Sequence, residues 1–308
     1  MVVMPMVFAL YSLFALVFTI SKVALLYSSP FFLIGSRMSF AGLLMLAYLL
    51  YRNPAELKMK MSSLRLILAL AFFNIYLTNV CEYWGLQYLT SFKTCFIYSL
   101  SPFVSALLSY FVWKERLSQK KWLGLVVGFA GFLPILLSMG QGESLSGQFG
   151  GLSFAEIAVT IAAVSSVWGW ILLGKLTRDE EKSPLFANGY SMLFGGIMAF
   201  THSAFFESWN PLPVTEFVPF VETTLALMVI SNLLAYNLYG HLLKTYSATF
   251  LSFAGFTTPL FTALFGYFFL GEVVGVSFFI SGSIVFSGLF LFHQEELKLG
   301  IRREPTPV

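Results

Sequence analysis

Residues 89–115 read LTSFKTCFIYSLSPFVSALLSYFVWKE, and residues 249–272 read TFLSFAGFTTPLFTALFGYFFLGE. The two stretches match when the first is shifted by 157 positions, which places Pro102 on Pro259. Each is apolar over about 20 residues, the length that crosses the hydrocarbon core of a bilayer. Proline is tolerated inside such a span because neighbouring helices can satisfy the carbonyl that it frees. The chain therefore contains a duplicated membrane-spanning helix.

Composition excludes a soluble fold. Of the 308 residues, 57% are hydrophobic and 11% are charged, whereas soluble domains carry about 25% charge. The net charge of +3 gives no reason to expect a nucleic-acid partner. Cys81 and Cys95 both lie in apolar runs without metal-ligand spacing. We predict an all-α integral membrane protein whose surroundings are the lipid bilayer, with neither a cofactor nor a metal.

Ten apolar runs can be distinguished along the chain. They cover 2–26, 30–51, 64–87, 89–113, 121–139, 151–174, 184–206, 217–243, 248–270 and 273–292. With ten crossings, 15 of the 18 Lys and Arg residues fall on the side of the two termini. Because Lys and Arg are enriched in cytoplasmic loops, both termini are predicted in the cytoplasm, on a multi-pass protein of the cell (inner) membrane.

A second match extends the duplication to whole halves. Ser29-Pro30 opens the second run and Ser183-Pro184 opens the seventh, and a Met and a Gly follow each proline at equal distances. Each half would then have five spans, and an odd number forces the second copy to insert upside down, as in many secondary transporters. We predict two inverted five-helix repeats, 1–140 and 151–292, followed by a cytoplasmic tail, 293–308, which is charged and expected to be disordered.

These features resemble the drug/metabolite transporter superfamily and its EamA family. That family's repeat has Ser-Pro opening the second helix, an Arg a few residues later, and a Pro-containing fourth helix that ends in Gly-Glu or Lys-Glu. The matching residues are Ser29, Pro30, Arg37, Ser101, Pro102, Lys114, Glu115, Ser183, Pro184, Thr258, Pro259, Gly271 and Glu272. The resemblance covers residues 5–292.

The resemblance implies ten transmembrane helices, a central cavity lined by the first four helices of each half, and alternating access for small organic solutes. The chain departs from the pattern at Ser191, which replaces the second-half Arg, and at Lys93, where the family has a small or apolar residue. Pro102, Glu115, Pro259 and Glu272 are expected to be structural. The two glutamates are expected to accept from amides that start the fifth and tenth helices.

Ionisable residues inside spans are functional candidates because a charge at the bilayer centre is costly. Asn79 and Glu82 lie on the third run, Lys93 lies near the start of the fourth, and Arg37 lies in the second. Glu82 and Lys93 are predicted at similar depth on adjacent antiparallel helices, where they can pair. Either Arg37 and Lys93 bind a substrate carboxylate or phosphate, or these charges form an ion-pair lock between helices.

The second half offers a polar and aromatic counterpart. Asn232, Tyr236 and Tyr239 follow helical spacing on the eighth run, and the 157-residue shift aligns Tyr239 with Glu82. We expect these three to line the cavity or to bond across helices. Trp168 on the sixth run is a candidate for stacking on a flat ligand, with membrane anchoring or packing as the alternative.

The best-supported function is secondary transport of a small organic metabolite. The chain as a whole resembles superfamily members that exchange S-adenosylmethionine for S-adenosylhomocysteine in intracellular bacteria. Export of an amino acid or a drug by the same fold is the alternative. A lipid-modifying enzyme would show clustered acidic or histidine residues, and an ATP-driven pump would show a phosphate-binding loop; neither pattern is present, so no enzyme activity is predicted. The sequence leaves open whether the chain forms a homodimer.

Overall fold

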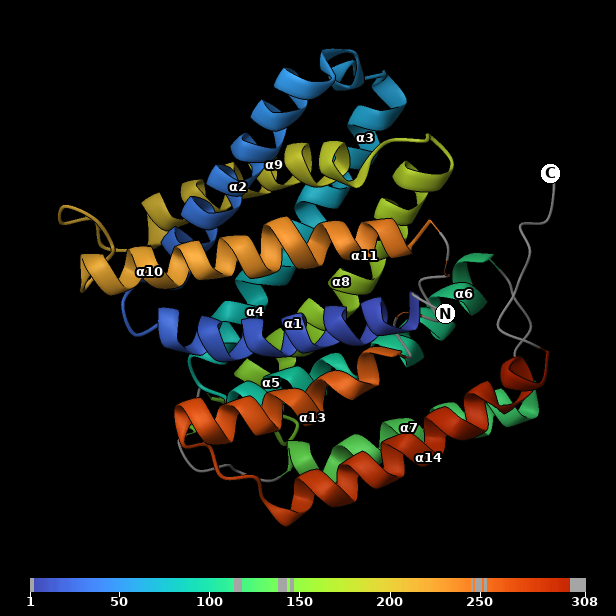
Figure 1. The fold of residues 1–308 in the computed structure, drawn as a ribbon. Coiled ribbons are helices and arrows are strands. Elements are labelled where there is room, and N and C mark those ends of the chain that lie inside the picture. The colour runs from blue at the N-terminus through green and yellow to red at the C-terminus, as the bar shows by residue number, and fades with distance from the viewer. Residues whose placement is uncertain are drawn as a thin grey trace.

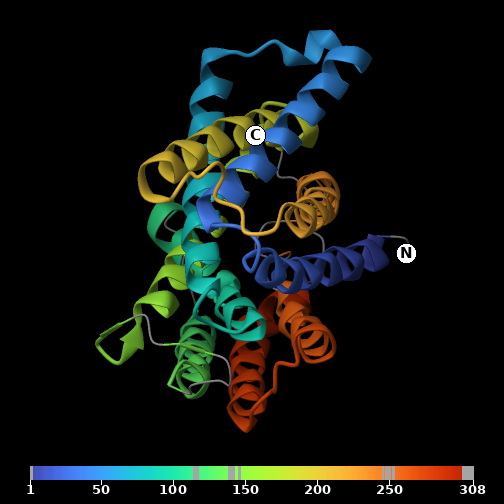
Figure 2. The same ribbon diagram turned by 90° about the vertical axis from the view of Figure 1, so that its left-hand side faces the viewer.

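The computed structural model describes residues 3–113, 118–137, 143, 144, 147–244, 246, 251 and 254–299. The regular structure in this part of the chain is helical apart from one antiparallel ribbon of β1 (Gln148–Phe149) and β2 (Leu152–Ser153) and an isolated antiparallel bridge between Ser28 and Val214. The helices lie side by side in a stack, with α2 and α9 at one end and α7 and α14 at the other (Figure 1). The view at 90° shows the same order (Figure 2).

The first half contains seven α-helices and two irregular helical segments in its described residues. They are α1 (Val3–Ala24), α2 (Pro30–Arg52), η1 (Pro54–Leu57), α3 (Met61–Leu70), η2 (Ala71–Leu77), α4 (Thr78–Leu86), α5 (Ser91–Tyr98), α6 (Ser101–Trp113) and α7 (Gln119–Leu136). The segment η2 is π-helical, so α3, η2 and α4 form one continuous rod from Met61 to Leu86.

The second half follows a similar order. Its helical elements are α8 (Phe154–Arg178), α9 (Pro184–Phe206), α10 (Phe217–Leu227), η3 (Met228–Ala235), α11 (Tyr236–Leu242), η4 (Gly255–Thr257), α13 (Thr258–Phe265), η5 (Gly266–Leu270) and α14 (Val276–Leu299). The π-helical η3 begins 157 residues after η2, and it joins α10 to α11 in the same way. The segment η5 is also π-helical, and the sequence did not predict any of these three π segments.

The helices are those of a multi-pass membrane protein. Among the described residues, six helices are long and apolar enough to cross a bilayer: Pro5–Ala24, Pro30–Arg52, Met61–Leu86, Ser91–Leu108, Phe154–Arg178 and Phe217–Leu242. Two shorter apolar helices are Gly255–Leu270 and Val276–Phe292. Each of the ten apolar runs contains helix, whereas ten crossings and an inverted second half stay predictions.

The duplicated proline span is interrupted rather than continuous. In the first half α5 ends at Tyr98 and α6 begins at Ser101, directly before Pro102. In the second half the short 3₁₀ segment η4 precedes α13, whose second residue is Pro259. Proline has no N–H to donate to the preceding turn, so both copies change helical geometry at the same point, next to the centre of the molecule.

Helices α2 and α9 pack against each other through glycines that the repeat places equivalently. A Cβ added at Gly42 would lie 2.6 Å from the Leu193 backbone nitrogen of α9. A Cβ added at Gly196 would lie 2.6 Å from the Ser39 backbone nitrogen of α2. Small residues allow helix backbones to approach closely in membranes, and here each helix supplies a glycine to the other.

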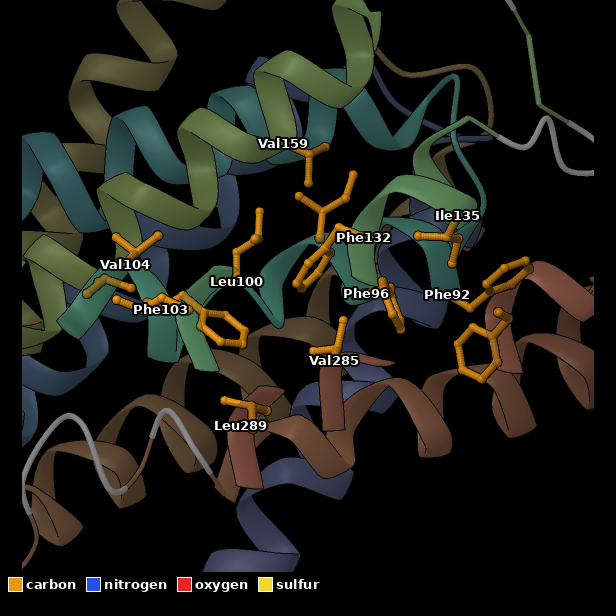
Figure 3. Close-up of a cluster of buried hydrophobic side chains, with 14 of the residues drawn as sticks. Phe92, Phe96, Leu100, Phe103, Val104, Phe132, Ile135, Val159, Val285 and Leu289 are labelled. Carbon is orange, nitrogen blue, oxygen red and sulfur yellow. The ribbon is translucent and has the colours of Figure 1, made fainter. Parts of the chain in front are cut away.

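A large apolar cluster fills the opposite end of the stack. Figure 3 shows side chains from α5, α6, α7, α8 and α14 turned toward one another. The Phe96 and Phe132 ring centroids are 5.1 Å apart, and Phe96 is 5.6 Å from Phe278. These distances suit edge-to-face aromatic packing. The cluster packs α5 against the α7–α14 pair. Other residues of α5 lie at the centre of the molecule.

The last helix is longer than predicted. It continues to Leu299, so the expectation of disorder was wrong for residues 293–299. Gln, Glu, Leu and Lys dominate this segment and are strong helix formers, which allows the helix to extend past its apolar part. The remaining tail lies outside the described residues.

Substituting a glycine at the α2–α9 contact should destabilise the fold. Gly42→Ala places a methyl group against backbone atoms of α9, and such overpacking costs about 1–3 kcal/mol. Gly174→Ala is the matched control, because its Cβ would meet no atom within 4 Å and alanine is favoured over glycine in helices by about 0.5–1 kcal/mol. Thermal unfolding in detergent should show a lower melting temperature for Gly42→Ala only. Equal melting temperatures would contradict this packing.

Candidate functional site

A cavity lies at the centre of the molecule, with about 860 Å³ of empty space including its mouth. Four helical rods of the first half and three of the second contribute to it. The lining residues are Tyr11, Phe14, Val17, Phe18, Arg37, Asn74, Thr78, Asn79, Glu82, Tyr83, Cys95, Tyr98, Ser99, Ser101, Ser166, Trp170, Ser231, Tyr236, Tyr239, Gly255 and Thr258.

Arg37 supplies the positive charge of the cavity. Its side chain is 1% exposed, and its Nη2 donates to Asn79 Oδ1 at 2.8 Å. The guanidinium carbon lies 5.1 Å from the centroid of the Tyr83 ring. Nε and Nη1 are buried without a hydrogen-bond partner, as are both amide atoms of nearby Asn74. Unsatisfied buried donors are costly, so Arg37 Nε and Nη1 and Asn74 Nδ2 form a ready site for an anionic group.

Asn79 holds the arginine in this position through the π segment below it. Its Nδ2 donates to the Ile75 carbonyl at 2.8 Å and to the Asn74 carbonyl at 3.3 Å. A π turn leaves carbonyls outside the usual i to i−4 pattern, and the amide satisfies them. The Oδ1 atom is thereby directed to Arg37. Asn79 thus both supports the helix and orients the cation.

Glu82 supplies the negative charge. It lies one turn further along α4, and its Oε2 accepts a hydrogen bond of 2.6 Å from the Tyr98 hydroxyl of α5. The ion pairs found among the described residues both involve Lys93, so Glu82 and Arg37 are not in salt-bridge contact with each other. They still interact electrostatically. The cavity therefore has one fixed cation and one carboxylate that are separated.

Aromatic rings form the wall on the second-half side. Trp170 of α8 stacks on Tyr239 with centroids 4.1 Å apart and planes 28° apart. Tyr236 is 5.0 Å from the same indole, and Phe14 of α1 contacts Trp170 at 6.3 Å. Aromatic faces of this kind attract cations and flat rings. The cavity can therefore bind a ligand with an anionic group, a cationic group and a planar ring.

The structure brings five of the eight predicted binding residues to the cavity. These are Arg37, Asn79, Glu82, Tyr236 and Tyr239, while Lys93, Trp168 and Asn232 are not among its lining residues. Trp168 and Trp170 are two positions apart on α8, about 200° around a helix. Only one of them can face the cavity, and it is Trp170. Both tryptophans also pack beside an apolar cluster.

Asn232 is directed elsewhere because the helix around it is not α-helical. It lies in η3, and its Nδ2 is 2.9 Å from Met38 Sδ and 3.6 Å from Met192 Sδ, between α2 and α9. In a π segment a residue is followed on the same face five positions later rather than four. Ser231, five residues before Tyr236, therefore lines the cavity in its place. Helical spacing in the sequence could not reveal this shift.

Lys93 pairs with other carboxylates than the predicted one. Its Nζ lies 2.7 Å from Glu156 Oε1 and 3.1 Å from Glu143 Oε2, so the expected pair with Glu82 was wrong. Lys93 is in the first turn of α5 and faces the start of α8, where Glu156 also closes a capping box with Ser153. The partner of Lys93 depends on how α5 is rotated about its own axis, and the depth of a residue in the membrane does not determine that rotation. The sequence contained a signal for this pair that was missed, because Glu156 is an acidic residue inside the apolar run 151–174.

Glu272 has a structural role, although its partner differs from the predicted one. Its carboxylate accepts from the Ser91 backbone N–H and hydroxyl, each at 2.7 Å. It therefore caps the start of α5 rather than the tenth helix. Gly271 adopts φ of 65°, a left-handed conformation suited to glycine, and turns the chain so that Glu272 reaches α5. Glu115 lies outside the described residues.

The cavity also includes residues that the sequence analysis did not select. Tyr11 and Phe14 of α1 carried no signal beyond aromatic character, and the Tyr11 hydroxyl bonds to the Leu251 carbonyl. Tyr98 shares α5 with Lys93 but lies over one turn later. Finding Tyr98 requires knowing which face of α5 turns toward Glu82 on the neighbouring helix α4. Within the described residues, no three His, Cys, Asp or Glu side chains are grouped as metal ligands.

Comparison with known proteins adds independent findings. The model of the EamA-like transporter family matches residues 2–137 and again residues 153–293. A protein of Chlamydia muridarum (strain MoPn / Nigg) named S-adenosylmethionine/S-adenosylhomocysteine transporter is 39% identical over 92% of this chain and 89% of its own length. A protein of the same name from Chlamydia trachomatis serovar L2 is 37% identical over 92% of this chain and 86% of its own. A solved crystal structure with 17% identity superposes with a TM-score of 0.66, covering 96% of this chain and 97% of that one, which is a likeness of fold.

The Lys93 cluster leads to a prediction about stability. Lys93→Met leaves Glu143 and Glu156 buried without their cation, and removing one partner of a buried pair typically costs about 3–5 kcal/mol. Adding Glu156→Gln restores the net charge of the cluster and should recover much of the folded protein. Adding Glu82→Gln to Lys93→Met should not. The yield of monodisperse protein on size-exclusion chromatography measures the effect, and rescue by Glu82→Gln would contradict the observed pairing.

Proposed function

The chain belongs to the EamA-like transporter family, and we propose that it exchanges S-adenosylmethionine for S-adenosylhomocysteine by alternating access. The family and the named relatives are transporters rather than enzymes. The observation that carries the proposal is the cavity, where a buried arginine with two unpartnered donors lies near a carboxylate and an aromatic wall. The carboxylate, the cationic groups and the adenine of an adenosyl amino acid each have a counterpart in these groups.

The amino-acid end is assigned to the first-half side of the cavity. Charge-assisted hydrogen bonds from an arginine to a carboxylate are among the strongest in proteins. In Arg37 the donors without a partner are Nε and Nη1, whose N–H groups are not parallel. A ligand carboxylate would accept a charge-assisted hydrogen bond from one of them. The ligand's positive groups would then lie toward Glu82 and the tyrosine rings.

The adenine end is assigned to the aromatic wall. Trp170 and Tyr239 already present stacked faces at the cavity, and a purine can continue such a stack. The polar side chains Ser166 and Ser231 line the same region and can bond to ring nitrogens. Export of an amino acid is the second candidate, because the Arg37 and Glu82 pair alone suits a zwitterion. An amino acid leaves the aromatic wall unused, which favours the adenosyl compounds.

We also assign the chain two inverted repeats, ten crossings and cytoplasmic termini in the inner membrane. Equivalent π segments, reciprocal glycine contacts between α2 and α9, and the one-sided distribution of Lys and Arg support this arrangement. In this arrangement the substrate lies between the halves, and rocking of one half against the other exposes it alternately.

Uptake of labelled S-adenosylmethionine into cells or vesicles that contain the chain tests the function. Preloading with unlabelled S-adenosylhomocysteine should accelerate uptake, and unlabelled amino acids and nucleotides should compete poorly. Arg37→Met should fold but lose at least about tenfold in uptake, because a charge-assisted hydrogen bond contributes about 1.5–3 kcal/mol. Arg52→Met, at the exposed end of the same helix, is the matched control and should transport normally. Normal uptake by Arg37→Met would remove this residue from the site.

Topology is tested by cysteine labelling in a Cys81→Ala, Cys95→Ala background. Ala55 and Ser208 are both exposed and are predicted on opposite sides of the membrane. In intact cells a membrane-impermeant maleimide should label Ser208→Cys, while Ala55→Cys should react only after permeabilisation. Labelling of Ala55→Cys from outside would reject the proposed orientation.

A further inference from the structure

We propose that Glu82 carries a proton outward with S-adenosylhomocysteine and releases it when S-adenosylmethionine binds, so that the exchange is coupled to protons and moves no net charge. This inference rests on the proposed function. It follows from the charges in this cavity and from the chemistry of the two ligands.

The two ligands differ by one positive charge. The methylated sulfur of S-adenosylmethionine is a sulfonium, whereas the thioether of S-adenosylhomocysteine is neutral, and both carry one ammonium and one carboxylate. A single cavity must therefore hold ligands of net charge +1 and 0. Changing the net charge of a water-poor site is expensive, so a site that serves both ligands benefits from a group that compensates the difference.

Glu82 is the group able to do this. It lines the cavity and is 8% exposed, and its hydrogen bond comes from a neutral phenol rather than a cation. By contrast, Glu143 and Glu156 are tied to Lys93, and Glu272 is tied to the start of α5. Among the described residues that line the cavity, Glu82 is the one carboxylate. It can be ionised or protonated without breaking an ion pair.

The groups that face Glu82 from the surrounding elements do not take over this role. They are Arg37 from α2, Tyr83 from its own helix, Cys95 and Tyr98 from α5, and Tyr236 from α11. Two further phenols line the same cavity, Tyr11 from α1 and Tyr239 from α11. From α8 the lining residues are Ser166 and Trp170, and from η2 Asn74, none of which titrates. Arginine stays charged, while phenols and thiols generally keep their protons at neutral pH. A proton exchanged in the cavity therefore belongs to Glu82.

The charges balance in both loaded states. With the sulfonium ligand and ionised Glu82, the charges of ligand, Arg37 and Glu82 add to +1. With the thioether ligand and protonated Glu82, they also add to +1. The proton is taken from solution on the side where S-adenosylhomocysteine binds and is released on the opposite side when S-adenosylmethionine displaces it. Each ligand then crosses in a complex of the same charge, and the cavity needs no separate adaptation for either.

Purified protein in liposomes provides the test. Vesicles loaded with S-adenosylhomocysteine and a pH dye are mixed with external S-adenosylmethionine, while valinomycin and potassium gradients set the membrane potential. We expect the interior to become alkaline by one proton per molecule taken up, and uptake to change less than about twofold between zero and inside-negative potential. Uptake that accelerates with inside-negative potential, without proton movement, would overturn the proposal. Absence of any uptake would instead refute the proposed function.

Glu82→Gln supplies an independent measurement by ligand binding. A neutral amide resembles the protonated carboxyl, so affinity for S-adenosylmethionine should fall at least about tenfold, the effect of roughly 1.4 kcal/mol, while that for S-adenosylhomocysteine should fall much less. Equal loss for both ligands would mean that Glu82 does not discriminate the sulfonium and would overturn the proposal.

Tyr98→Phe, which removes only the hydrogen bond to Glu82, should shift the pH dependence of S-adenosylmethionine binding while preserving the preference between ligands. If Glu82→Gln fails to fold, the proton and potential measurements on the wild-type protein still decide.

Discussion

Glutamate side chains from one half of the chain hold the starts of helices in the other half. Glu207, at the end of α9, accepts from the Phe31 and Phe32 amides at the start of α2, at 2.7 and 2.9 Å. Glu56, after α2, accepts from Ser183 at the start of α9 at 3.2 Å. The first amides of a helix lack internal partners, and leaving them unsatisfied in an apolar setting is costly. These reciprocal caps fix how far α2 and α9 slide along each other, and with them the depth of Arg37.

The apolar runs, the prolines and the duplication could be predicted because each depends on local composition or on comparison of the chain with itself. The π segments could not, since Asn74 and Asn232 look like ordinary helical residues in the sequence. One extra residue in a turn rotates all that follows by about 100°, which brings Ser231 rather than Asn232 to the cavity. The same limit applies to Lys93, whose predicted depth was compatible with Glu82 while its rotation favoured Glu156.

Fold and site share residues at the first π segment. Asn79 satisfies two backbone carbonyls and presents its oxygen to Arg37. In the second half Asn237, one residue after the position that the 157-residue shift aligns with Asn79, likewise satisfies the carbonyls five and four residues before it, those of Asn232 and Leu233. The second copy has no arginine to orient, because Ser191 stands at that place. The duplication thus accounts for the helix geometry that the two halves share. The residues that differ between the halves, such as Arg37 and Ser191, account for the charge of the cavity.

Buried charges in this protein have two kinds of environment, and the contrast separates structure from function. Lys93 has two carboxylate partners within 3.1 Å, and Glu272 has two donors at the start of a helix. Arg37 has one amide oxygen and two unpartnered donors, and Glu82 has one phenol. A protein that needed these last two charges only for stability would gain by bringing them together, since a buried pair offsets part of the desolvation cost of each charge. Keeping them out of direct contact beside a cavity is favourable when a ligand pairs with both, and that condition is met by a molecule with charges of both signs.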